Sequence, residues 1–193
     1  MRFSCLLCQC EYFEEAAPFL CTSCFARLEL ARPHSEITSL FRYNEASRKL
    51  ILLVKIEGNY RALSCLCHLF LNSAQVGELS QRNQVIVPAP SSLWSRMRGR
   101  FDLAWLLSAA LARQTQCKLQ RAPLHLYWQT KKRSKLGERE GVEIPSRCEG
   151  KLPDTNTLIV DDVVSSGHTL RRTALALKNT RPNYLTLASA LAD

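Results

Sequence analysis

The stretch TLIVDDVVSSGHTL at residues 157–170 constrains the fold more than any other part of the chain. Its apolar run, Leu158–Val160, is short and β-branched, which is typical of a strand buried on both faces of a parallel sheet. Asp161 and Asp162 follow directly, and we expect them to close the strand at the edge where open α/β sheets bind ligands. Helical spacing then begins at Leu170. The order predicts a strand, an acidic pair, a short loop and a helix.

The loop between the acidic pair and the helix consists of groups that bind anions. It brings hydroxyls and backbone N–H groups to a helix N-terminus, which is a site for phosphate. The carboxylates suit ribose hydroxyls and Mg²⁺ instead. A sugar 5-phosphate satisfies both halves, and its predicted contacts are Asp161, Asp162, Ser165, Ser166, Gly167, His168 and Thr169. The alternative is an ordinary strand–turn–helix unit with two solvated acids.

Four of the nine cysteines have the spacing of a metal site. Cys5-x₂-Cys8 and Cys21-x₂-Cys24 form two pairs separated by twelve residues, which is typical of a structural Zn²⁺ held by four thiolates. The intervening segment is too short and too acidic to form a core of its own, so a metal would have to hold it together. A redox role is the less favoured alternative. An exchange of Cys8 for Cys10 as ligand stays open.

The net charge of +9 is concentrated in one segment. Residues 96–139 contain eleven Lys/Arg and two Asp/Glu, whereas the rest of the chain is balanced. Such a concentration is typical of a surface that binds a polyanion, either pyrophosphate or nucleic acid. The alternative is a solvated basic face.

The composition is that of an ordinary globular protein, with 46% hydrophobic and 22% charged residues among 193. No apolar run approaches the roughly 20 residues of a membrane span. The start, MRFSCLLCQC, has no apolar region with a cleavage site. We therefore expect no membrane span and a cytoplasmic location.

Strand and helix patterns alternate after the cysteine segment and predict an α/β fold with a doubly wound parallel sheet. We expect a metal module at 1–30 and the α/β domain at 31–193. Residues 31–44 are expected to be a connection, and 128–153 a loop. Expected helices lie around Leu50–Glu57, in 61–74, in 101–116 and from Leu170 onward. Expected strands lie at Val85–Val87, within 117–128, at Leu158–Val160 and at 184–191.

The stretch LIVDDVVSSGHTL resembles the ribose-5-phosphate loop of type I phosphoribosyltransferases, which use phosphoribosyl pyrophosphate (PRPP). The resemblance implies that Asp161 and Asp162 contact the ribose hydroxyls and that Ser165 to Thr169 surround the 5-phosphate. With the four-cysteine segment in front, the chain resembles the ComF/GntX family of competence proteins over nearly its whole length. That resemblance implies a phosphoribosyltransferase-like domain behind a zinc finger.

Further segments carry this resemblance. Lys55 and Gly58 in LILLVKIEGNY match the family pattern, as do VIVPAP and RMRG, although Arg100 intervenes where the family has an aromatic residue directly after the glycine. The resemblance implies that the turn at Pro88–Pro90 lies near the pyrophosphate and that 128–140 forms a hood. The predicted contacts to pyrophosphate or DNA phosphate are Pro88, Ala89, Pro90, Arg96, Arg98, Lys131, Lys132 and Arg133.

Three functions are compatible with these features. The first is a PRPP-binding protein of natural transformation that acts on incoming single-stranded DNA with other DNA-uptake proteins. The second is a nucleobase-salvage phosphoribosyltransferase, and the third is a non-catalytic PRPP-sensing module. The cysteine pairs and the placement of charge favour the first. No acceptor and no catalytic residue is identified, and Glu138 and His168 are only candidates for acid–base roles.

Overall fold

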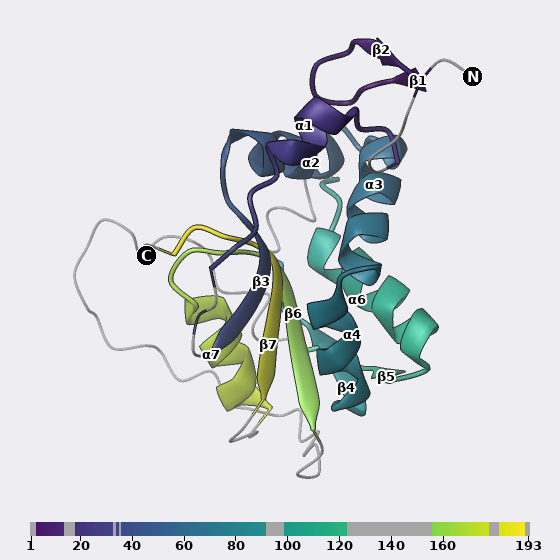
Figure 1. Cartoon of the computed structure of the whole chain (residues 1–193). Helices are drawn as coiled ribbons and strands as arrows, with labels where there is room; N and C mark the ends of the chain where they lie inside the picture. Colours follow the sequence, from purple (N-terminus) through teal and green to yellow (C-terminus); the bar gives the residue numbers. More distant parts are fainter. Residues whose placement is uncertain are drawn as a thin grey trace, which may run out of the picture.

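The computed structural model describes residues 3–13, 18–32, 34, 36–91, 99–122, 156–177 and 182–191. Within these ranges a five-stranded sheet has the order β3-β7-β6-β4-β5, and its pairings are all parallel (Figure 1). Its strands are β3 Ile37–Arg42, β4 Val85–Pro88, β5 Lys118–Leu119, β6 Thr157–Val164 and β7 Asn183–Ser189. The predicted parallel α/β architecture is confirmed.

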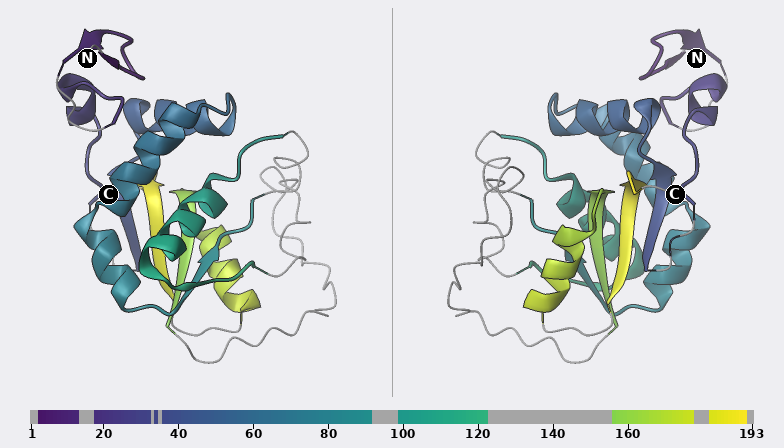
Figure 2. Two further views of the ribbon diagram at one scale, coloured as in Figure 1. Left: turned by 90° about the vertical axis from the view of Figure 1, so that its right-hand side faces the viewer. Right: turned by 90° about the vertical axis from the view of Figure 1, so that its left-hand side faces the viewer.

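Helices cover both faces of this sheet. α7 (His168–Ala176) lies on one face, and α6 (Leu103–Thr115) lies on the other with α3 (Tyr60–Leu71) and α4 (Ala74–Gln81) beside it (Figures 1 and 2). α2 (Glu45–Lys55) follows β3 and lies near the edge where the strands end. No helix in the described part of the chain is long and apolar enough to cross a membrane.

The apolar run of β6 divides between two cores. Leu158 and Val160 belong to the larger core, which includes buried residues of α2, α3 and α6. Ile159 belongs to the smaller core beneath α7. Successive side chains of a strand point to opposite faces, so a strand covered on both faces must be apolar at every position. This explains why the run is continuous rather than alternating.

The cysteine-bearing segment consists of short elements at one end of the molecule (Figure 2). They are β1 Phe3–Ser4, paired antiparallel with β2 Glu11–Tyr12, and α1 Thr22–Ala26. Buried residues of this segment, such as Leu20 and Leu28, join the larger core. The division of the chain at residue 30 stays a prediction.

The expectation that residues 31–44 form a connection is wrong, because they contain the edge strand β3. β3 pairs with β7 along its length. A serine interrupts its apolar residues, which hides the strand signal in the sequence. Ser39 is nevertheless buried, and its hydroxyl lies 2.7 Å from that of Thr186 in β7. A buried hydroxyl is tolerated when it has such a partner.

Two boundaries around the acidic pair also differ from expectation. β6 does not end at the acids but continues to Val164, because its last residues pair with Ala188 and Ser189 of β7. The following helix begins at His168 rather than at Leu170.

Two further elements differ in extent or number. α4 was not expected, since the pattern of 61–74 suggests one helix, whereas α3 ends at Leu71. The strand expected within 117–128 is the two-residue β5 in the described residues. The other predicted helices and strands are confirmed within a few residues.

Candidate functional site

A cavity of about 420 Å³ opens where β4 and β6 end. Six of the residues predicted to contact ligand line it: Asp161, Asp162, Ser165, Thr169, Ala89 and Pro90. The exposed Ser166 and His168 belong to the same loop but do not line the cavity, and Pro88 is a buried residue of β4. The fold therefore joins the loop after β6 to the turn after β4, as the parallel sheet requires.

The two acids lie side by side in β6 but in different surroundings. Asp162 is buried, and its Oδ1 accepts a hydrogen bond of 2.8 Å from the backbone N–H of Val163. Burial, reinforced by the neighbouring charge of Asp162, raises the pKa of Asp161 well above its usual range. Two adjacent carboxylates that are largely shielded from solvent favour the binding of a cation or a hydrogen-bond donor, because either one compensates their charge.

Lys55 is a site residue to which the sequence assigned no contact. It is the last residue of α2, it lines the cavity, and its ammonium group pairs with Oδ2 of Asp162. The only sequence signal for it is the match of LILLVKIEGNY to a family pattern. Lys55 and Asp162 are more than a hundred positions apart, so only the folded chain brings them together.

The loop before α7 has the geometry of an anion site. Gly167 has φ +72°, and no side chain caps the helix that follows it. The guanidinium group of Arg171 donates a hydrogen bond of 3.1 Å to the Ser166 carbonyl and lies 3.9 Å from the Glu36 carboxylate. Arg171 thus holds the loop from outside, and the N–H groups of the first helical turn remain available for an anion.

Apolar side chains, including one ring of an aromatic pair, also line the cavity. Ile56 and Phe101 line the cavity, and the exposed ring of Tyr60 meets Phe101 edge-on at 5.8 Å. Gly58 has φ +64°, and a Cβ atom there would lie 2.8 Å from the Phe101 ring. Glycine at this position therefore allows α2 and Phe101 to approach each other.

Asp102 continues this side of the cavity and starts α6. Its Oδ1 accepts a hydrogen bond from the Trp105 N–H at 3.2 Å, and its Oδ2 accepts one from the Ser91 hydroxyl at 2.7 Å. These bonds tie the turn after β4 to the start of α6.

The four predicted metal ligands come together in the structure. The sulfur atoms of Cys5, Cys8, Cys21 and Cys24 lie within 4.8 Å of one another. The Cys8 and Cys21 sulfurs are 3.7 Å apart, close to the roughly 3.8 Å between sulfurs around a tetrahedral Zn²⁺ with bonds of about 2.3 Å. The cluster is compatible with structural zinc.

The pKa values of Cys8 and Cys24 in this cluster are shifted in opposite directions. A hydrogen bond from the Cys10 thiol lowers the pKa of Cys8 to about 6. Burial and the neighbouring thiols raise the pKa of Cys24. Four thiolates this close repel one another unless a metal neutralises them. The Cys10 sulfur lies 2.9 Å from the Cys8 sulfur, so an exchange of Cys8 for Cys10 as ligand stays open.

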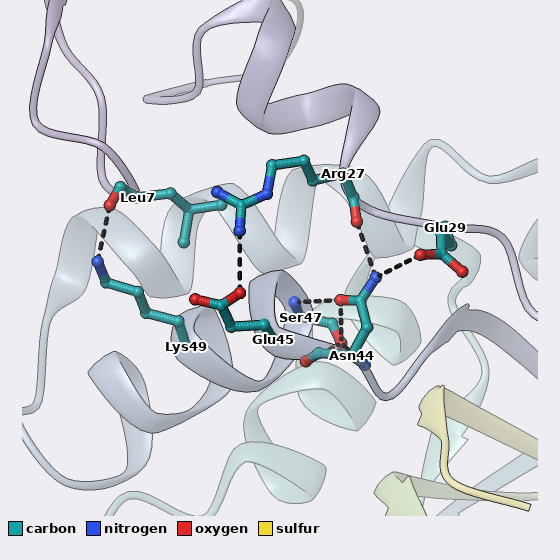
Figure 3. Close-up of polar contacts among 7 residues, drawn as sticks. All are labelled: Leu7, Arg27, Glu29, Asn44, Glu45, Ser47 and Lys49. Carbon is teal, nitrogen blue, oxygen red and sulfur yellow. Dashed lines mark hydrogen bonds and ion pairs between the residues drawn. The ribbon is translucent and has the colours of Figure 1, made fainter.

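Polar contacts attach the cysteine segment to α2, as Figure 3 shows. The Lys49 ammonium donates a hydrogen bond of 2.7 Å to the Leu7 carbonyl, and Arg27 reaches the Glu45 carboxylate at 3.1 Å. Asn44, the residue before α2, accepts a hydrogen bond from the Ser47 N–H and donates one to the Arg27 carbonyl. The segment is thus bound to the first half of α2, whereas Lys55 occupies its last turn.

All five basic residues predicted to bind phosphate lie outside the described residues. These are Arg96, Arg98, Lys131, Lys132 and Arg133. Within the described part of the basic segment, the Arg121 guanidinium lies 4.5 Å from the centre of the Trp105 ring. The roles of the phosphate-binding candidates stay predictions.

We predict about one zinc ion per purified chain. Cys21→Ser should lose this metal and expose residues 1–30 to protease, because a metal-dependent segment unfolds without its ion. Cys10→Ser is the matched control and should keep the metal. Elemental analysis and limited proteolysis measure both outcomes. Metal loss from Cys10→Ser with retention in Cys8→Ser would instead make Cys10 the ligand.

Asp161→Asn should raise the melting temperature of the ligand-free protein at pH 8. Because the pKa of Asp161 is higher in the folded than in the unfolded state, its contribution to the free energy of unfolding falls as pH rises through that interval. Asparagine keeps the shape without the charge. The gain should shrink as pH falls toward 4, as measured by calorimetry. The control Glu78→Gln, at an exposed position on α4, should not raise the melting temperature. A rise for Asp161→Asn that grows on acidification would contradict the raised pKa.

Two comparisons with known proteins find similarity to phosphoribosyltransferases. The family model of the phosphoribosyl transferase domain matches residues 106–193, which include β6, the acidic pair, the loop and β7. Among solved structures, the crystal structure of orotate phosphoribosyltransferase from Aeropyrum pernix is similar, with 19% identity and a TM-score of 0.44. The match covers 74% of this chain and 64% of that chain. A search of curated proteins gives no match.

The part of the chain that matches the family model is the part that supplies the acidic pair and the anion loop to the cavity. Residues 106–193 are therefore similar to a phosphoribosyl transferase domain within a parallel α/β sheet, and the four cysteines near the N-terminus are placed so that they could hold a metal.

Proposed function

We propose that the protein binds PRPP with Mg²⁺ in the cavity at the ends of β4 and β6. The observation that carries this proposal is the placement of the acidic pair and the Ser165–Thr169 loop, which open into the same cavity. Carboxylates repel phosphate but accept hydrogen bonds from vicinal hydroxyls. A phosphate and a diol on one sugar therefore suit the two halves of this site.

Each part of the ligand has a corresponding group in the protein. Asp161 and Asp162 accept hydrogen bonds from the ribose hydroxyls. The hydroxyls of Ser165 and Thr169, with the N–H groups at the start of α7, bind the 5-phosphate. Ala89 and Pro90, in the turn after β4, also line the cavity, and the resemblance implies that the pyrophosphate binds near them.

The charges of the cavity fit a magnesium-dependent ligand. Its lining includes three aspartates, Asp102, Asp161 and Asp162, against two cations, Lys55 and Arg100, among the described residues. A polyanion entering such a site needs additional positive charge. Mg²⁺ bound near the acidic pair would neutralise the pyrophosphate, the leaving group in a transfer from the ribose.

PRPP with Mg²⁺ should raise the melting temperature. At a ligand concentration of about 100 Kd, the added stability is about 2.7 kcal/mol, or roughly 5–10 °C for a chain of this size. Asp161→Asn with Asp162→Asn should abolish the rise and leave the fold intact. The control pair, Glu57→Gln with Glu78→Gln, removes the same charge from exposed positions and should keep it. A rise that persists in the aspartate double variant would remove the acids from the site.

We further propose that the protein is a ComF-family component of natural transformation that handles incoming single-stranded DNA in the cytoplasm. Two features support this role: the four-cysteine cluster, which is compatible with zinc, and the basic segment 96–139. Aromatic residues interleaved with basic ones bind single strands without sequence preference. Within that segment, Trp105 lies beside Arg121.

The DNA-binding proposal is tested by salt dependence. Affinity for an oligonucleotide should fall with salt at a log–log slope of about −0.7 per neutralised phosphate. The triple variant Lys131→Ala, Lys132→Ala and Arg133→Ala should reduce the slope by about two, equally for unrelated sequences. If the wild type shows no oligonucleotide binding at low salt and the triple variant no longer binds PRPP, the basic residues serve only the phosphate ligand.

Two alternatives share the same PRPP site. A nucleobase-salvage phosphoribosyltransferase would release pyrophosphate from PRPP when given a free base. A PRPP-sensing module would bind the ligand and release none. Assay of pyrophosphate release with a panel of nucleobases distinguishes these alternatives from each other.

A further inference from the structure

We propose that Lys55 is an exchangeable counter-ion: it occupies the acidic pair in the free protein and gives way to the divalent cation and ribose when ligand binds. This inference rests on the proposed PRPP function. It assigns a positioning role to a residue on α2, outside the segment that matches the phosphoribosyl transferase model.

The argument begins with the oxygens of Asp162. Its Oδ1 accepts the Val163 N–H at 2.8 Å, within β6 itself. Its Oδ2 is the oxygen left to accept a group from the cavity, and the Lys55 ammonium pairs with it. A ribose hydroxyl or a divalent cation approaching Asp162 therefore meets Lys55 first.

The charges explain why a cation belongs there in the free protein. The Asp162 side chain is only 11% exposed, and Asp161 is its direct neighbour. Two carboxylates in such surroundings repel each other and lose hydration. An ammonium group at Oδ2 reduces both costs. The adjacent Asp161 still has a raised pKa, so one lysine does not fully compensate the pair.

The side chain of Lys55 is suited to move. It is 34% exposed and projects from the last turn of α2, on a flexible chain of four carbons. The helix itself is held, because Lys49 and Glu45 bind the cysteine segment six and ten residues earlier (Figure 3). The Lys55 ammonium group can therefore leave Asp162 without displacing α2. It can then contact the pyrophosphate in the same cavity.

The exchange predicts opposite effects on two ligands. Without PRPP, Lys55→Met should bind Mn²⁺, used as a probe for Mg²⁺, on the order of tenfold more tightly than the wild type, because the competing ammonium is gone. For PRPP with Mg²⁺, the same variant should bind on the order of tenfold more weakly, because it has lost a pyrophosphate contact. A purely structural lysine would not move the two affinities in opposite directions.

The experiment is an electron paramagnetic resonance titration of free Mn²⁺, followed by calorimetric titration of PRPP with Mg²⁺. Lys55→Gln should repeat the result of Lys55→Met, and Lys55→Arg should keep the wild-type Mn²⁺ affinity. Arg48→Met is the matched control, since it removes one charge from an exposed position on the same helix. Adding Asp162→Asn to Lys55→Met should abolish the gain.

The outcomes separate this inference from the proposed function. If Lys55→Met and Lys55→Gln bind Mn²⁺ no more tightly than Arg48→Met while the wild type binds PRPP, the exchange is wrong and the PRPP site stands. If Mn²⁺ affinity rises in the Lys55 variants but neither they nor the wild type bind PRPP, Lys55 is the counter-ion of the acidic pair. The PRPP proposal then fails.

Discussion

The pairing of β6 between β4 and β7 is the constraint on which the rest of the structure depends. Because both faces of β6 are covered, Leu158, Ile159 and Val160 are apolar, and the two acids follow them toward the carboxyl end of the strand. The central position of β6 in the sheet places the two acids beside the turn after β4 and near α2. The cavity lies where these elements meet, since its lining comes from the carboxyl ends of β4 and β6, from α2 and from the start of α6.

The acidic pair lowers the stability of the free protein in order to create a site. Burial and mutual repulsion raise the pKa of Asp161, so the charged form of this residue opposes folding at neutral pH. Lys55 offsets part of this cost, and a ligand with hydroxyls and a divalent cation would offset more. Perturbed pKa values cluster at functional sites, which is consistent with a binding role for the acidic pair.

α2 connects the two functional parts of the molecule. Its first half holds the cysteine segment through Asn44, Glu45 and Lys49, and its last residue reaches Asp162. The Arg27–Glu45 ion pair is exposed and contributes little free energy by itself. The buried side chains of the segment, which are continuous with those of α2 and α3, provide most of the attachment. The four-cysteine segment and the cavity are therefore both in contact with α2.

The sequence by itself determined the features that depend on neighbouring residues. The strand and helix around the acidic pair, the anion loop and the two cysteine pairs are all visible there, because strand burial, capping and metal spacing are local. Only the tertiary structure decided the rest. β3 is hidden in the sequence because its buried Ser39 needs Thr186, which lies far along the chain. β6 extends past the acids because β7 supplies partners for Val163 and Val164. Lys55 joins the site because folding, and no local pattern, carries its charge to Asp162.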